Sequence, residues 1–75
     1  MNWSGEWDFQ LNDGTWAPIT IIELDMEVIV CDEHNRVVNS RWDKDTWIRV
    51  LEECIVLNRL SRRTLIHKDL KRHSL

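Results

Sequence analysis

Residues 7–17 decide the fold, and they read Trp7-Asp8-Phe9-Gln10-Leu11-Asn12-Asp13-Gly14-Thr15-Trp16-Ala17. The first five side chains alternate apolar and polar, which places the apolar ones on one face of a β-strand. An Asp-Gly pair follows, and glycine readily adopts the positive φ that tight hairpin turns need. Residues 7–19 are therefore predicted to form a β-hairpin. Pro18 lacks a backbone donor, so the return strand is predicted to lie at a sheet edge or to end there.

Two further stretches with strand propensity follow this hairpin. Residues 19–24 form the first, and residues 28–31 form the second, in which both faces are apolar as in a central strand. Residues 32–35 make a polar loop, and residues 36–42 return with strand propensity. Residues 28–42 are therefore predicted to form a second β-hairpin.

The period of the apolar side chains becomes helical after the second hairpin. One arc of this helix carries Trp47, Val50, Leu51, Cys54, Ile55 and Asn58. Arg49 and Glu52 lie on the opposite arc, which is the pattern of an amphipathic helix. Asp43 and Asp45 offer carboxylates for its N-terminus, where the helix dipole favours negative charge. A helix is predicted over residues 45–60.

Together these elements predict an α+β domain, with a small, mainly antiparallel sheet of about four strands from two hairpins packed on a C-terminal helix. The chain of 75 residues is expected to be one domain. Residues 1–42 are mostly β, residues 43–60 are helical, and residues 61–75 are a basic helix or tail. Ser61 is able to cap a second helix, and residues 64–67 have the propensity for a short strand, so both structures stay open for the last segment.

Five tryptophans stand out in so short a chain. A chain of this length buries only roughly 60–65% of its unfolded surface. Each aromatic side chain is able to bury roughly 150–250 Å², so most of the tryptophans are expected to lie in the core. Tryptophan is also enriched at binding hot spots. One or two, with Trp3 as the candidate, are therefore expected to be exposed anchors for a partner.

The charges are separated along the chain. Residues 1–58 hold four basic and twelve acidic side chains, a net charge of −8, whereas residues 59–75 hold six basic and one acidic, a net charge of +5. The basic side chains of the last segment are Arg59, Arg62, Arg63, Lys68, Lys71 and Arg72. This segment is expected either to bind a charged partner, or to lie in solvent or against the acidic part of the chain. Asp25 and Glu27 are the candidate contacts of the acidic surface with a basic partner.

Neither a metal site nor a catalytic site is predicted. Tetrahedral zinc sites use close pairs of Cys and His ligands, and Cys31 and His34 make one such pair. His67 and His73 fall at the edge of the required spacing, and Cys54 lies on the apolar helix face. Residues three apart in a strand point to opposite faces, which disfavours a catalytic pair of Cys31 and His34. The chain has no glycine-rich phosphate loop, so we expect no metal, no cofactor and no enzymatic activity.

The cysteine count and the hydropathy indicate the cellular compartment in which the protein is expected. Two cysteines do not make the disulfide framework of a small secreted domain. The chain has no apolar run of about 18 residues, and its acidic first residues do not resemble a secretory signal. A cytoplasmic protein without a membrane partner is expected.

These observations favour a non-enzymatic interaction module, or a small regulator or inhibitor, including those of phage type. Its partner is expected to be another protein, contacted through an acidic, tryptophan-bearing surface or through the basic C-terminal segment. The alternative is a nucleic-acid-binding regulator that uses residues 59–75, whose basic side chains suit phosphates. A homodimer is a competing use of any exposed apolar patch.

Overall fold

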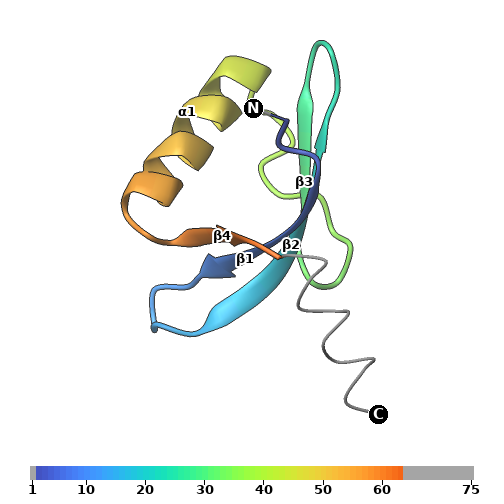
Figure 1. The fold of residues 1–75 in the computed structure, drawn as a ribbon. Helices are drawn as coiled ribbons and strands as arrows, with labels where there is room; N and C mark the ends of the chain where they lie inside the picture. The colour runs from blue at the N-terminus through green and yellow to red at the C-terminus, as the bar shows by residue number, and fades with distance from the viewer. Residues whose placement is uncertain (1, 64–75) are drawn as a thin grey trace, which may run out of the picture.

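The computed structural model describes residues 2–63, which form one sheet and one helix (Figure 1). The elements in chain order are β1 (Gly5–Gln10), β2 (Trp16–Glu23), β3 (Val28–Cys31), α1 (Lys44–Val56) and β4 (Leu60–Arg62). Every neighbouring pair of strands is antiparallel, and the order in the sheet is β3-β2-β1-β4. The predicted α+β class, with a four-stranded antiparallel sheet and one helix, is confirmed. The expectations for Lys68, Lys71 and Arg72 fall outside the described residues.

The β1–β2 hairpin forms as its turn chemistry predicts. Gly14 adopts a φ of 90°, which glycine reaches without steric penalty. Leu11 N–H donates to Thr15 O at 2.7 Å, and Gly14 N–H donates to Leu11 O at 3.0 Å, so residues 12–14 form the loop. The Asp13 carboxylate accepts from both the backbone N–H and the hydroxyl of Thr15, at 2.9 and 2.7 Å. The loop is therefore fixed by backbone and side-chain bonds together.

Pro18 lies inside β2, and β2 is an interior strand, so the expected edge position or strand end is wrong. Leu11 and Thr15 form a hydrogen-bonded pair, and such pairs alternate with non-bonded ones along antiparallel strands. Pro18, opposite Asp8, therefore occupies a non-bonded position, and its nitrogen faces the β3 side. Because β3 pairs with β2 only from Thr20 onward, proline removes no ladder bond there.

The hairpin predicted over residues 28–42 is replaced by a hairpin of β2 with β3. The chain does reverse after β3, and an isolated bridge joins Cys31 to Val37. Asn39 then adopts a φ of 47°, a left-handed conformation that asparagine tolerates better than most residues. The chain turns away from the sheet at this point and crosses to the start of α1, so the return strand does not form.

The start of α1 agrees with its predicted cap. Asp43 precedes the helix, and its carboxylate accepts from Thr46 N–H at 2.8 Å. Trp47 and Leu51, one turn apart, are the buried residues of the helix, which confirms the predicted apolar arc. The helix therefore presents one face to the sheet from its first turn.

The end of α1 comes earlier than predicted, at Val56. Asn58 adopts a φ of 59°, which is incompatible with a continuing helix. Arg59 N–H donates to Cys54 O at 2.8 Å, and Asn58 N–H donates to Ile55 O at 3.0 Å. These two bonds make a Schellman cap, which satisfies the last carbonyls of the helix and redirects the chain into β4.

The fourth strand comes from the segment predicted to be a basic helix or tail. β4 pairs antiparallel with β1 and matches Leu60 with Phe9 and Arg62 with Trp7. Ser61 therefore lies in a strand and does not cap a second helix. The pairing closes the sheet around β1, the first strand of the chain.

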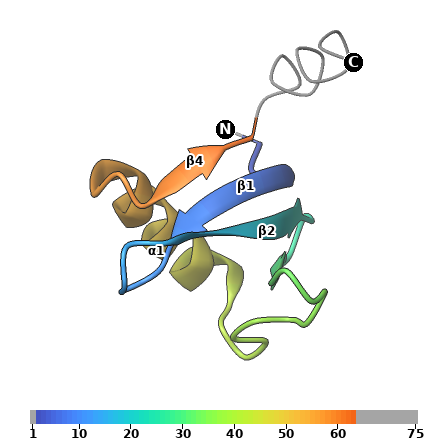
Figure 2. The same ribbon diagram turned by 90° about the horizontal axis from the view of Figure 1, so that it is seen from below.

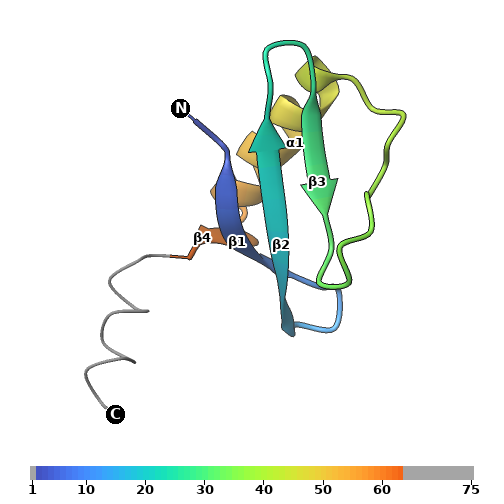
Figure 3. The ribbon, with the colours of Figure 1, turned by 90° about the vertical axis from the view of Figure 1, so that its right-hand side faces the viewer.

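The sheet has a helix-side face, covered by α1, and an outer face that no described helix covers (Figures 2 and 3). The buried core between the sheet and α1 consists of Trp3, Trp7, Ile21, Val28, Val30, Trp47, Leu51 and Leu60. Phe9 packs against this core from the helix-side face, next to Trp7 on the same strand, as the alternation predicts.

Candidate functional site

The five tryptophans divide between the core and the surface. Trp3, Trp7 and Trp47 are buried, whereas Trp16 and Trp42 keep 48% and 40% of their surfaces exposed. Trp3, the candidate anchor, is only 4% exposed. Its carbonyl oxygen accepts from Trp7 Nε1 at 2.9 Å. Trp3 is therefore a core residue, and the tryptophans that a partner is able to contact are Trp16 and Trp42.

Asp25 and Glu27 lie at the turn between β2 and β3, and both are exposed. Met26 between them is 88% exposed and projects into solvent. Lys44, at the first position of α1, holds this turn against the helix, since its Nζ donates to Leu24 O at 2.7 Å. Neither carboxylate lines either of the two main hollows of the described residues.

Arg62 contacts the N-terminal part of the same chain. Its guanidinium carbon lies 4.2 Å from the centroid of the Trp7 ring, a cation–π arrangement. The same guanidinium donates to Asn2 O at 2.7 Å and to Ser4 O at 3.2 Å. Arg62 therefore ties β4 to the residues that precede β1.

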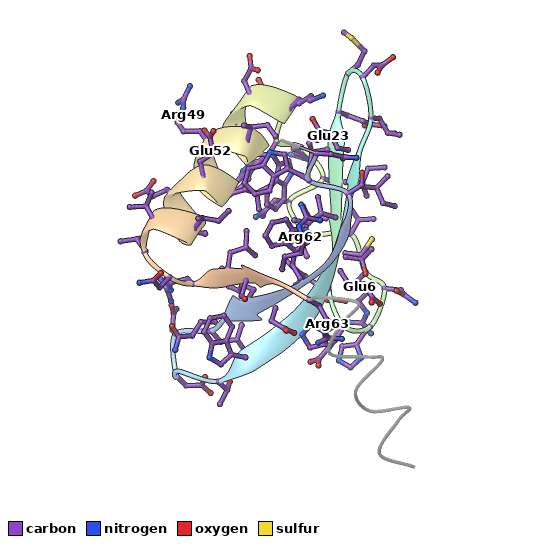
Figure 4. The ribbon with its side chains drawn as sticks, viewed as in Figure 1. Glu6, Glu23, Arg49, Glu52, Arg62 and Arg63 are labelled. Carbon is purple, nitrogen blue, oxygen red and sulfur yellow. The ribbon has the colours of Figure 1, made fainter. Side chains whose placement is uncertain are left out.

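Arg63 and Arg59 also make contacts within the chain. Arg63 donates to the Asp8 carboxylate, and this hydrogen bond raises the pKa of Arg63. Figure 4 places Arg63 near Glu6, whose charge acts on it in the same direction. Arg59 donates to Asn12 Oδ1 at 2.9 Å. All three arginines that the structure describes in the basic segment are thus bonded to neighbouring strands or loops.

The acidic and basic candidate residues do not form one site. Asp25 and Glu27 lie at one end of the sheet, and β4 with its arginines lies toward the other end (Figure 1). Lys68, Lys71 and Arg72 fall outside the described residues. The described structure therefore offers no shared surface for these two groups.

A groove opens between α1, the sheet and the segment that joins β3 to α1, with a volume of about 390 Å³. We call it the Trp42 groove, and its main lining residues are Phe9, Ala17, Val38, Trp42, Val50 and Cys54. Ala17 is paired with Phe9 on the helix-side face, and its small side chain leaves space above the sheet. Trp42 packs against Trp47 with ring centroids 4.8 Å apart. The groove is therefore bounded by α1, by the helix-side face of the sheet and by the segment between β3 and α1.

The rim of the Trp42 groove combines exposed apolar residues with two acidic residues. Leu11 is 42% exposed at the end of the β1–β2 hairpin, and Trp42 is 40% exposed. Asp32 and Glu33, at the turn after β3, also line the groove. Backbone hydrogen bonds, first from Arg36 N–H and then from His34 N–H, lower the pKa of Asp32, and burial opposes them. Asp32 is therefore ionised at neutral pH.

Cys54 is the one thiol among the lining residues of the Trp42 groove. Burial raises the pKa of this thiol, so it stays protonated at neutral pH and is a weak nucleophile. Cys31 follows the buried Val30 in β3 and points to the outer face, while the His34 side chain is 69% exposed. Among residues 2–63, no group of three or more His, Cys, Asp or Glu side chains is placed to hold a metal ion.

The outer face of the sheet carries a second set of exposed apolar side chains. Trp16 and Ile22, on β2, are 48% and 41% exposed, and Val37 beside β3 is 55% exposed. None of them lines either of the two main hollows. The second hollow, of about 350 Å³, lies beside Trp3 and Glu23 at the opposite side of α1. It has fewer apolar lining residues than the Trp42 groove.

Comparison of the chain with protein-family models, with curated proteins and with solved structures finds no match. The Trp42 groove is therefore interpreted from its own geometry and chemistry. Within residues 2–63, no helix is both long enough and apolar enough to cross a membrane.

The sequence places several lining residues on the apolar faces of the first strand and of the helix, but it does not predict the Trp42 groove. It predicts Trp42 in a return strand, and Asp32 and Glu33 in a polar loop. The available signal was Asn39, because asparagine favours left-handed turns that redirect a chain. Nothing in the sequence places the redirected segment beside α1, so the groove becomes visible only in three dimensions.

Proposed function

We propose that this protein is a non-enzymatic interaction module that binds another protein through the Trp42 groove. The observation that supports this proposal most directly is the exposure of Leu11 and Trp42 on the rim of one apolar hollow. Concave apolar surfaces with a few polar groups are the usual form of binding sites. Partly exposed tryptophans on a rigid support are typical binding hot spots. The acidic, tryptophan-bearing surface expected from the sequence is thus proposed at Trp42, Asp32 and Glu33.

The size of the groove is consistent with a few inserted side chains of a partner. Its volume of about 390 Å³ lies at the lower end of the range of ligand sites, about 300–1,000 Å³. A partner that fills it would bury the exposed parts of Leu11 and Trp42, and Trp42 already packs against the buried Trp47. Apolar burial of this kind contributes about 25 cal/mol per Å² before the costs of association.

The described residues give less support to the nucleic-acid alternative. Residues 2–63 hold seven basic and twelve acidic side chains, a net charge of −5. Their arginines at positions 59, 62 and 63 already contact other groups of the chain. A phosphate backbone needs a surface on which positive charge dominates.

Affinity capture from a lysate of the source organism tests the proposal, with two groove variants and two matched controls. Leu11→Asp and Trp42→Ser change the rim of the groove. Leu24→Asp and Trp16→Ser make the same substitutions at residues of similar exposure outside it. We expect at least one protein to be retained by the wild type and both controls and to be lost from both groove variants.

The controls also define the opposite result. Circular dichroism melting of each variant establishes that loss of a prey does not reflect unfolding. A prey that both folded groove variants retain would contradict the proposal. A prey that only Trp16→Ser loses would contradict it too, and would place the binding surface on the outer face. Retention of nucleic acid alone, removed by nuclease, would favour the alternative function.

A further inference from the structure

We infer that the segment bound in the Trp42 groove is basic: a Lys or Arg side chain of the partner, flanked by apolar residues, contacts Asp32 and Glu33. This inference rests on the proposed function and names the chemistry of the partner. The flanking apolar residues lie against Leu11 and Trp42, and the basic side chain lies between the aromatic wall and the carboxylates.

The charge of the groove supports a basic ligand. Its charged lining residues, within the part of the chain that the structure describes, are Asp32 and Glu33, and no Lys or Arg lines it. Both side chains are acidic, so a neutral or acidic peptide would bury or crowd carboxylates without a counter-charge. A basic side chain supplies that counter-charge and the hydrogen-bond donors that carboxylates accept.

Asp32 is held in place before any ligand arrives. Its Oδ1 accepts from His34 N–H at 2.8 Å and from Arg36 N–H at 3.0 Å. These bonds stabilise the ionised carboxylate and fix its orientation in the turn, which Asn35 closes with a φ of 61°. A pre-oriented carboxylate loses little conformational entropy when it binds a cation.

Neither His34 nor Arg36 neutralises this pair. His34 Nε2 lies 3.7 Å from Glu33 Oε1, but both side chains are more than half exposed, at 69% and 52%. Exposed contacts of this kind contribute little. The charge of Arg36 lowers the pKa of Asp32 less than the hydrogen bond from the backbone N–H of Arg36 does. Glu33 is therefore able to exchange its contact with His34 for one with a partner.

The aromatic wall also suits a basic side chain. Trp42 packs against Trp47 at an interplanar angle of 59°, and both residues line the groove. Guanidinium and ammonium groups bind favourably over tryptophan faces. The aliphatic stems of Arg and Lys cover apolar surface while the charged end reaches a carboxylate. One side chain thus satisfies both features of the groove.

Selection from a display library of short random peptides tests the inference without assuming a sequence. The full-length protein is the bait, and peptides that also bind Trp42→Ser are removed. We expect the enriched peptides to contain Lys or Arg beside apolar residues. Enrichment of neutral or acidic peptides would overturn the inference and leave the proposed function standing. No enrichment over Trp42→Ser would count against both, because the groove would then bind no peptide.

Two charge-neutral double variants test the contact with the carboxylates. Asp32→Asn with Glu33→Gln removes both charges of the groove and keeps the side-chain shapes. Asp25→Asn with Glu27→Gln removes the same charge at the β2–β3 turn. Affinity for an enriched basic peptide should fall about tenfold in the first variant, since bonds to charged groups contribute about 1.5–3 kcal/mol. The second should change it by less than about threefold. An equal loss of affinity in both double variants would show that only the net charge of the protein matters, which would overturn the inference.

Thiol protection locates the bound peptide, because the chain has only two cysteines. In Cys31→Ser the remaining thiol is Cys54 in the groove, and in Cys54→Ser it is Cys31 on the outer face. The peptide should slow alkylation of Cys54 and leave that of Cys31 unchanged, and the reverse would overturn the inference. A triple variant, Lys68→Glu, Lys71→Glu and Arg72→Glu, tests whether the chain's own basic segment occupies the groove. If Cys54 is alkylated much faster in this variant than in the unchanged chain, both without peptide, the groove binds that segment and the inference is overturned.

Discussion

At the scale of single residues, the side chains that stabilise this domain make several kinds of contact at once. Trp7 is buried in the core, donates its Nε1–H to Trp3 O and carries the Arg62 guanidinium on its ring. A small domain has few core residues, so each contributes a large share of the stability. This explains why Trp3 and Trp7 are internal even though tryptophan is a common anchor for partners.

Replacement of Trp7 should therefore be severe. Trp7→Ala removes a buried aromatic side chain and should lower the free energy of unfolding by about 3–5 kcal/mol, against a total of about 4–11 kcal/mol for a domain of this length. Urea denaturation followed by circular dichroism measures the change. Trp16→Ala, at a residue that is 48% exposed, is the control and should cost less than about 1 kcal/mol. Similar losses at both positions would contradict the assignment of Trp7 to the core.

The carboxylates predict a loss of stability in acid. Hydrogen bonds from Thr15, Trp3, Arg36 and Thr46 lower the pKa values of Asp13, Glu23, Asp32 and Asp43. A lowered pKa in the folded state adds stability that is complete above the ordinary carboxyl pKa of about 4. That stability is lost as the pH falls through the lower folded values.

Urea midpoints measured between neutral pH and about pH 3 test this dependence. The midpoint should stay level down to about pH 5 and then decrease. Glu23→Gln, which cannot ionise, should flatten the decrease, because the bond that lowers the pKa of Glu23 most comes from the backbone N–H of Trp3. A midpoint that rises on acidification would show that charge repulsion within the acidic domain outweighs these bonds.

At the scale of elements, the end of α1 determines the position of β4. The Schellman cap centred on Asn58 terminates the helix and turns the chain back toward β1. Leu60 then enters the core next to Phe9. The left-handed conformation of one residue thus connects the helix to the sheet.

Substitutions at residue 58 should follow backbone preference. Asn58→Gly should leave the stability unchanged or raise it slightly, because glycine adopts a φ of 59° without strain. Asn58→Val should lower it by about 1–2 kcal/mol, which shifts the melting temperature of a domain of this size by roughly 4–16 °C. Thermal melting at 222 nm measures both variants. If valine were tolerated as well as glycine, the left-handed cap would not be required.

At the scale of the whole molecule, the sheet of the described residues is completed by the pairing of β1 with β4. β1 lies between β2 and β4, and Arg62 bonds the residues before β1. The helix-side core and the Trp42 groove both depend on this arrangement, since Phe9 belongs to β1 and lines the groove.

Removal of β4 should therefore unfold the domain. A chain that ends at Asn58 lacks Leu60, which is 6% exposed in the core, and leaves the β4 side of β1 unpaired. We expect this chain to lose its cooperative thermal transition. The full-length Val56→Ser variant, changed at a residue that is 78% exposed, should melt as the wild type does. A cooperative transition in the shortened chain would mean that β1–β3 and α1 suffice for the fold.

The sequence by itself determined the first hairpin, the apolar arc of the helix and the Asp43 cap. Each is encoded within a few consecutive positions, as alternation over residues 7–11, an Asp-Gly turn, or a carboxylate before a helical period. The division between acidic and basic segments was visible in the same way. Local spacing and local hydrogen bonding are enough to predict such features.

Only the tertiary structure decided the identity of the fourth strand, the interior position of Pro18 and the existence of the Trp42 groove. A strand of three residues is too short to show an alternating period, and its pairing depends on the free side of β1, some fifty residues earlier. Pro18 is tolerated because β3 ends before reaching it. Trp42, Asp32 and Leu11 line one groove together with residues of α1. No local sequence pattern encodes that arrangement. The separation in sequence of these contacts is the physical reason that they could not be predicted.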